Sequence, residues 1–271
     1  MTLKILQAVT SLRVGDGTAV GAVDLPLARE RHTRWPFVPG SSLRGALRGR
    51  ATALGHGVDE VEAVFGSTPP EPGVVGDDLR MGTLRVGQAT LLALPVRSLT
   101  RTFLLLTCPT ALARLRRAAG FELEVPNPDV HQVCGANDRP NHLEEAGIVY
   151  VEDLDLEAVH DPTVAAWAQR LRAHGGDELA VERLVVVHDD VFAHACTAWT
   201  ELRTRNRIEP STGVVRKGQL FDVEFLPSET LMWVPLEGSG ADLLPANGET
   251  FGLGGHQSVG AGRVVWSGGP S

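Results

Sequence analysis

Apolar residues recur with two different periods along the chain, and the period predicts which segments are strands and which are helices. Short apolar and β-branched runs predict strands at 3–14, 84–88, 91–96, 102–107, 184–188, 231–236 and 263–266. Helical spacing predicts helices after Gly40 and at 110–119, 164–173 and 189–202. In the helix after Gly40, Leu43 and Leu47 form an apolar stripe, and Gly55 and Gly57 are expected to end it.

Three connections are long. Residues 18–40 contain three prolines and predict an ordered loop, and a loop of that length inside a compact domain usually has a function. Residues 67–78 predict a surface loop, and 122–147 show little periodicity and predict an insertion. Strands and helices alternate with antiparallel hairpins, so we expect an α+β fold with a ferredoxin-like core and large insertions, within a single domain spanning 1–271.

Residues 203–225 predict a long hairpin, with two strands around a Pro-Ser-Thr-Gly turn. Arg203, Arg205 and Arg207 alternate along the first strand and project from one side. Three like charges on one face are unfavourable unless they meet an anion. An exposed polar hairpin is the other interpretation, and the spacing alone does not choose between them.

A second basic segment spans residues 24–50, where six arginines stand against Asp24 and Glu30: Arg29, Arg31, Arg34, Arg44, Arg48 and Arg50. Ser41 and Ser42 are candidate N-caps of the predicted helix. A helix start after Gly-Ser-Ser offers free backbone N–H groups, which bind phosphate well. The alternative is a solvated basic face on which the serines act only as caps.

A glycine-rich loop closes the chain, running from Phe251 to Gly262 before the last strand. It matches neither the dinucleotide fingerprint nor the P-loop pattern, so no nucleotide cofactor is expected. Gly254, Gly255 and Gly260 still allow a backbone to approach phosphates closely. A simple turn is the alternative.

Composition changes this picture in two ways. The net charge of −8 argues against a nucleic-acid binder on average, although it does not exclude basic patches. Aromatic residues make up only 5% of the chain, so any RNA would be held by its backbone and shape rather than by stacking on aromatic rings. Three scattered cysteines predict a reducing cytoplasm, and no apolar run is long enough to span a membrane.

Histidine chemistry is weakly indicated. His131, Cys134 and His142 do not have the spacing of a common zinc module. His32 lies in the basic loop and is a candidate general base, although a hydrogen-bonding loop histidine is the simpler interpretation.

Five stretches in the same order resemble the RAMP superfamily of CRISPR proteins, and in particular the Cas7-like backbone subunit of the type III-B (Cmr) effector complex. Two are specific: VDLPLARERHT at Val23–Thr33 and PFVPGSSLRGALR at Pro36–Arg48. The others are Ala89–Ser98 with Thr107–Pro109, Arg203–Pro227, and Gly254–Arg263.

The resemblance implies an RRM-like palm with loop 15–40, an insertion at about 120–160 and a thumb hairpin at about 203–225. It implies copies stacked along a guide crRNA with other Cmr-type subunits, and cleavage of complementary target RNA at regular intervals with a divalent cation, Mg or Mn. Asp24 matches the family's catalytic loop aspartate and is the possible metal ligand. The predicted RNA-binding residues are Arg29, Arg31, Ser41, Ser42, Arg44, Arg48, Arg203, Arg205, Arg207, Gly254, Gly255 and Gly260.

This chain departs from the family pattern at two positions. Arg13 stands where the family often has a histidine, and Gln88 where an acidic residue is common. The first departure puts a helping histidine in doubt. Three alternatives remain: a catalytically silent RNA-binding backbone subunit, the related type III-A backbone subunit, and a monomeric guide-processing endonuclease that relies on His32.

Overall fold

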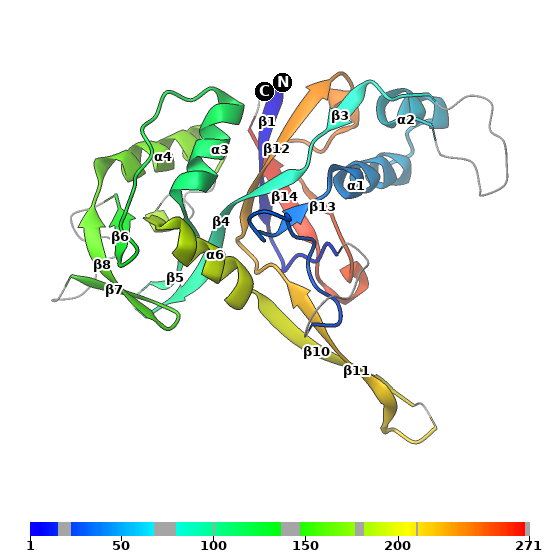
Figure 1. The fold of residues 1–271 in the computed structure, drawn as a ribbon. Helices are drawn as coiled ribbons and strands as arrows, with labels where there is room; N and C mark the ends of the chain where they lie inside the picture. The colour runs from blue at the N-terminus through cyan, green and yellow to red at the C-terminus, as the bar shows by residue number, and fades with distance from the viewer. Residues whose placement is uncertain are drawn as a thin grey trace.

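A computed structural model describes residues 1–15, 23–67, 80–99, 101–136, 147–176, 182–209 and 211–268. Its fold is mixed α/β and is built on one long, strongly curved sheet (Figure 1). The order of neighbouring strands is β13 (Thr250–Gly252), β14 (Arg263–Ser267), β1 (Thr2–Ala8), β12 (Leu231–Gly238), β4 (Ala89–Ser98), β5 (Thr102–Thr107), β9 (Leu184–Val187), β6 (Gln132–Gly135), β8 (Leu154–His160) and β7 (Ile148–Val151).

The sheet curls back on itself in its second half. Ser98 at the end of β4 pairs with Val151 of β7, which closes β4, β5, β9, β6, β8 and β7 into a ring. In the first half, β1 lies between β12 and β14 and is antiparallel to both. Two short strands, β2 (Phe37–Val38) and β3 (Leu84–Val86), add to β4 and β12.

Helices cover both halves of the sheet (Figure 1). α1 (Gly40–Ala53) and α2 (Val58–Phe65) pack together beside β3, and α3 (Pro109–Ala119) and α6 (Asp189–Ala198) contact β4. α4 (Pro162–Ala173) packs on β6 and β9. Apolar faces explain this arrangement, because Leu43 and Leu47 of α1 and Trp167 of α4 are completely buried. Among the described residues, no helix is long and apolar enough to cross a membrane.

The predicted hairpin is a separate two-stranded sheet that projects from the body (Figure 1). It consists of β10 (Glu201–Ile208) and β11 (Val215–Phe225), and we call it the thumb. Arg203 lies opposite Val223 and Arg205 opposite Phe221, so these four side chains share one face. The register shifts between Asn206 and Ile208, toward the tip.

Several predicted boundaries need correction. The first strand ends at Ala8 rather than at residue 14, and the helix predicted for 189–202 ends at Ala198, because the chain then enters β10. The periodicity missed α2, which is only eight residues long. The predicted insertion at about 120–160 contributes β6, β7 and β8 to the sheet itself, so it is not a separate excursion. Most of the predicted loop at 67–78 lies outside the described residues.

Candidate functional site

Asp24 is exposed and is held against the root of the thumb. Its Oδ2 accepts a hydrogen bond from the backbone N–H of Asp222 at 2.9 Å. The next residue, Leu25, pairs with Val223 as a parallel bridge, with hydrogen bonds from Leu25 N to Asp222 O and from Glu224 N to Leu25 O, both 3.1 Å. The loop that carries Asp24 is therefore an added edge of the thumb, and the position of the carboxylate follows that of the hairpin.

A buried carboxylate, that of Glu224, also holds the loop of Asp24 in place. Glu224 is only 4% exposed, and it accepts hydrogen bonds from Leu27 N at 2.9 Å and from Thr200 Oγ1 at 2.7 Å. Arg29 completes the cluster with an ion pair to Glu224. Sequence reasoning missed Glu224, although a charged residue between the apolar Val223 and Phe225 at the base of a strand was an available signal.

Arg29 faces the protein and not the solvent. Its side chain is 9% exposed, and Nη1 donates to the carbonyl oxygens of Arg34 and Cys196, each at 2.8 Å. The predicted RNA contact does not fit this position, because the guanidinium already has partners on three sides. By contrast, Arg31 and His32 lie exposed at the turn of the loop.

A second buried carboxylate, Glu30, fixes the far end of the loop. Arg114 of α3 donates two hydrogen bonds to it, at 2.6 and 2.9 Å, and Thr33 and Gln88 donate at 2.7 and 3.2 Å. Burial alone raises the pKa of Glu30, but the hydrogen bonds from Arg114 and Thr33 outweigh it and leave the pKa below its usual value. The network ties the loop to α3 and to the start of β4.

The start of α1 differs from the prediction. The helix begins at Gly40 with Pro39 as its N-cap, so Ser41 and Ser42 lie in the first turn and do not cap it. A Cβ on Gly40 would lie 2.5 Å from the carbonyl oxygen of Val86, so the glycine is required by close packing against the end of β3. Ser41 is exposed at the helix terminus, where the helix dipole favours an anion.

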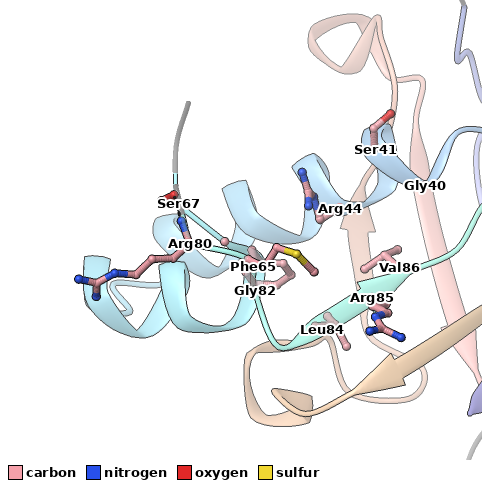
Figure 2. A pocket seen from close by; sticks show the side chains of 12 residues that line it. Gly40, Ser41, Arg44, Phe65, Ser67, Arg80, Gly82, Leu84, Arg85 and Val86 are labelled. Atoms are coloured by element: carbon pink, nitrogen blue, oxygen red, sulfur yellow. Dashed lines mark hydrogen bonds between the residues drawn. The ribbon is translucent and has the colours of Figure 1, made fainter. Parts of the chain in front are cut away.

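A cleft of about 460 Å³ opens beside that helix start, between α1, the end of α2 and β3 (Figure 2). Figure 2 shows Arg44 rising from α1 and Arg85 extending from β3 near the cleft, whereas Arg80 points away from the other labelled residues. The predicted contact residues Ser41 and Arg44 thus lie together. Arg48 does not join them, because it donates to Gly66 O at 2.7 Å and lies 3.5 Å from Glu62 of α2.

The glycine-rich loop lies beside the thumb root. Gly254 has a φ of +78°, and a Cβ there would lie 2.2 Å from the carbonyl oxygen of Arg13, so only glycine fits. Gly255 N donates to the same oxygen at 2.9 Å, and Gly260 is exposed with a φ of +88°. Gly254 and Gly255 thus lie against Arg13, which follows β1, and Gly254 has a structural reason of its own.

His256 is a residue of this loop that sequence reasoning missed. Its ring lies against Phe225 of the thumb, with centroids 5.6 Å apart, and its φ is +64°. Partial burial, and then the charges of Arg205 and Arg13, lower its pKa from the usual 6.5. His256 reaches the thumb only through the fold of its loop, so spacing along the sequence does not predict its position. The one signal was Arg13, which stands where the family often has a histidine.

Arg203 and Arg205 behave differently, although both project from the same face of β10. Arg203 stacks over Phe225 at 4.7 Å and donates to Ser11 Oγ and to Glu201, both at 2.6 Å. Arg205 is partly exposed. The side chain of Arg207 is outside what the structure describes.

Comparison with known proteins places this architecture in a family. The family model described as the RAMP superfamily matches residues 5–265, and the chain belongs to that superfamily. Within it, the chain is a relative of Cmr4. It is 31% identical to the "CRISPR system Cmr endoribonuclease Cmr4" of Pyrococcus furiosus, over 96% of this chain and 92% of that protein.

Solved structures agree with the fold. The crystal structure of oligomeric Cmr4 from Pyrococcus furiosus matches with a TM-score of 0.75 and 23% identity, covering 98% of this chain and 97% of that one. A chain of the type III-B Cmr-beta complex bound to cognate target RNA matches with a TM-score of 0.74 and 17% identity, covering 98% and 96%.

Proposed function

We propose that the chain is a backbone subunit of a type III-B CRISPR effector complex in the cytoplasm, and that it cleaves target RNA. It binds guide crRNA, stacks with other copies of itself and with other Cmr-type subunits, and cuts the complementary target. The observation that carries this proposal is the fixed place of Asp24, an exposed carboxylate held at the root of the thumb. The 31% identity to a Cmr endoribonuclease supports it, and the fold is similar to that of oligomeric Cmr4.

The arrangement suits backbone recognition of RNA. Exposed or partly exposed arginines lie on three segments: Arg31, Arg44 and Arg205. An arginine binds phosphate without any stacking of RNA bases on aromatic rings. Contacts to phosphates do not depend on base sequence, and a subunit that binds guides of different sequence requires such contacts. The helix start at Gly40 and the cleft with Arg44 form the guide-holding half of the surface.

Asp24 is the residue for the chemistry. Because Oδ2 is fixed by Asp222 N, the carboxylate has a set orientation, and its other oxygen is able to accept the proton of a 2′-OH. The 2′ oxygen then bonds to the adjacent phosphorus and the bond to the 5′ oxygen breaks. The 5′ oxygen takes a proton from water, which leaves a 2′,3′-cyclic phosphate and a 5′-hydroxyl. In-line geometry is supplied by a target strand distorted at the thumb.

A divalent cation is also part of the proposed reaction, and the described residues of this chain offer it few ligands. Among the described residues, no group of three or more His, Cys, Asp or Glu side chains is arranged to hold a metal ion. The residues that the structure describes form no metal cage, so Mg²⁺ would take Asp24 as one ligand and RNA phosphates and water as the others. A metal bound in this way would stabilise the charge that develops on the phosphate.

The finer description of the architecture is also a proposal. We assign β1, β12, β14 and α1 to a ferredoxin-like, RRM-like palm within one domain, 1–271, from which the thumb extends. The antiparallel pairing of β1 with both neighbours supports this assignment.

The test is Asp24→Asn in a complex assembled with guide RNA and its partner subunits. Cleavage of labelled target RNA should fall at least about 100-fold, the typical contribution of a general base, while target binding is unchanged. Asp155→Asn, an exposed aspartate on β8, is the matched control and should cut at the unsubstituted rate. Normal cutting by the assembled Asp24→Asn complex contradicts the assignment. Binding without cutting by the unsubstituted complex supports the silent backbone subunit instead.

A further inference from the structure

Three positively charged or chargeable side chains converge where the glycine-rich loop meets the thumb. They are Arg13 after β1, Arg205 on β10 and His256 in the loop, next to the short helix Gln257–Val259. Arg205 projects from the face of the thumb on which Phe225 meets the ring of His256, and the charges of Arg205 and Arg13 both lower the pKa of His256. Arg13 Nη1 lies 3.6 Å from the place of a Cβ on Gly255, so the guanidinium lies alongside the loop.

Within the part of the chain that the structure describes, this cluster has no counter-ion. Among the described residues, neither Arg13 nor Arg205 forms an ion pair, and Arg13 Nε is buried without a hydrogen-bond partner. The nearby Arg203 is different, because it pairs with Glu201. Converging like charges cost free energy, and a chain with net charge −8 has ample acidic residues to offset them. None of the acidic residues that the structure describes pairs with Arg13 or Arg205, which points to an anion from outside the chain.

The cluster lies close to the loop of Asp24. A Cβ on Gly15 would lie 3.0 Å from Arg13 Nη2 and 3.2 Å from the carbonyl oxygen of Pro26, so the guanidinium stands beside the residue two positions after Asp24. On the thumb, Phe225 under His256 continues the strand whose Asp222 holds Asp24. An anion in the cluster therefore sits at the same thumb root as the proposed cleavage residue.

We propose that Arg13, Arg205 and His256 form a binding site for one phosphate of the RNA backbone at the root of the thumb. This proposal rests on the proposed function, since it specifies how the same surface holds RNA. Arg13 and Arg205 supply permanent charge, and two N–H groups of Arg13 are suited to two phosphate oxygens. His256 adds a charge that depends on pH.

The sign of the pH dependence follows from the neighbours of His256. In the free protein Arg13, Arg205 and partial burial disfavour the imidazolium, and the thumb side of the ring presents Phe225 and, over it, Arg203. A bound phosphate reverses the local charge and favours the imidazolium, so binding takes up a proton. Affinity for RNA should rise as pH falls through the bound-state pKa and level off below the free-state pKa.

The first experiment measures the salt dependence of binding. The full-length chain is titrated with a labelled single-stranded RNA of mixed sequence at several KCl concentrations. Arg13→Gln should reduce the slope of log affinity against log salt by about 0.7, the loss of one phosphate contact on a single strand. Arg13→Lys keeps the charge and should keep the slope, and Arg117→Gln, an exposed arginine at the end of α3, is the matched control.

The second experiment measures the pH dependence with the same RNA. The unsubstituted chain should bind about tenfold more tightly at about pH 5.5 than at about pH 7.5, the effect of one pKa unit on one group. His256→Gln should lose that gain and bind normally at the higher pH, whereas His131→Gln, an exposed histidine elsewhere, should keep it.

The two possible failures are distinguishable. A chain that binds RNA but shows the same salt slope in Arg13→Gln, or the same pH dependence in His256→Gln, overturns the phosphate site and leaves the proposed function standing. A chain that binds no RNA overturns both.

Discussion

At the scale of residues, two buried carboxylates fix the position of Asp24, the proposed catalytic residue. Glu224 and Glu30 are 4% and 8% exposed, and each gathers donors from the loop of Asp24 and from the body of the protein. Asp24 itself is exposed and has little packing of its own. The loop is therefore positioned by side chains that are buried within the protein.

Replacing Glu224 should show this. Glu224→Ala leaves the buried Arg29 without its ion pair and should lower the free energy of unfolding by about 3 kcal/mol, measured by urea denaturation. Glu237→Ala removes an exposed partner of Arg85 and should cost less than about 1 kcal/mol. Equal losses in the two variants would contradict the role assigned to Glu224.

Glu30 predicts a pH dependence of stability. Its folded-state pKa is lowered, so its contribution is present above the pKa of the unfolded chain, about 4.3, and is lost as pH falls through the folded-state pKa. Glu30→Gln should therefore flatten the decline in unfolding free energy below about pH 4.5. Glu60→Gln on α2, exposed to solvent, should leave the decline as it is.

At the scale of elements, the start of α1 shows how packing and function compete for one position. Gly40 is required because β3 lies against the helix, and the same first turn lines the cleft together with Arg44. The Gly-Ser-Ser pattern, which predicts a phosphate-binding helix start, thus has a structural cause as well.

Two glycines of the same helix give a matched pair of predictions. Gly40→Ala places a methyl group 2.5 Å from Val86 O and should destabilise the protein by about 1–3 kcal/mol. Gly45→Ala has nothing within 4 Å and should stabilise it by about 0.5–1 kcal/mol, because alanine favours the helix. Thermal unfolding followed by circular dichroism measures both, and a stable Gly40→Ala variant would show that β3 can move.

At the scale of the whole molecule, the closed half of the sheet and the lone thumb differ in what supports them. The ring from β4 to β7 buries apolar residues on its strands, including Leu92, Val186 and Val133. The thumb is only two strands, and it exposes large apolar side chains such as Ile208, Val214 and Leu220.

Hydrogen exchange should follow this division. The backbone amides of β10 and β11 that lie between Val223 and the tip of the thumb should exchange faster than those of β4 and β5, because a two-stranded ribbon has few contacts to protect it. Mass spectrometry of the free chain measures the difference. Equal protection would mean that the thumb packs against something in solution, such as a second copy.

The sequence predicted most of the elements, because strands such as 102–107 and the thumb carry clear alternation or turn residues. The structure puts Asp24 at the root of the thumb and Arg44 beside the cleft at the start of α1, and their roles stay predictions. Prediction from the sequence failed where the role of a side chain depends on tertiary contacts. Arg29 and Arg48 look like surface charges until their partners Glu224 and Glu62 arrive from distant segments, and His256 gains its setting from Arg13 and Phe225.

The bond from Asp222 N to Asp24 has a consequence for how the site tolerates mutation. The donor is a main-chain group, so nearly any side chain at position 222 preserves it, and among the twenty residues only proline lacks it. Saturation mutagenesis at 222 should therefore reveal a position that looks dispensable apart from one residue. The hydrogen bond that holds the proposed catalytic carboxylate therefore tolerates almost every substitution of the residue that donates it.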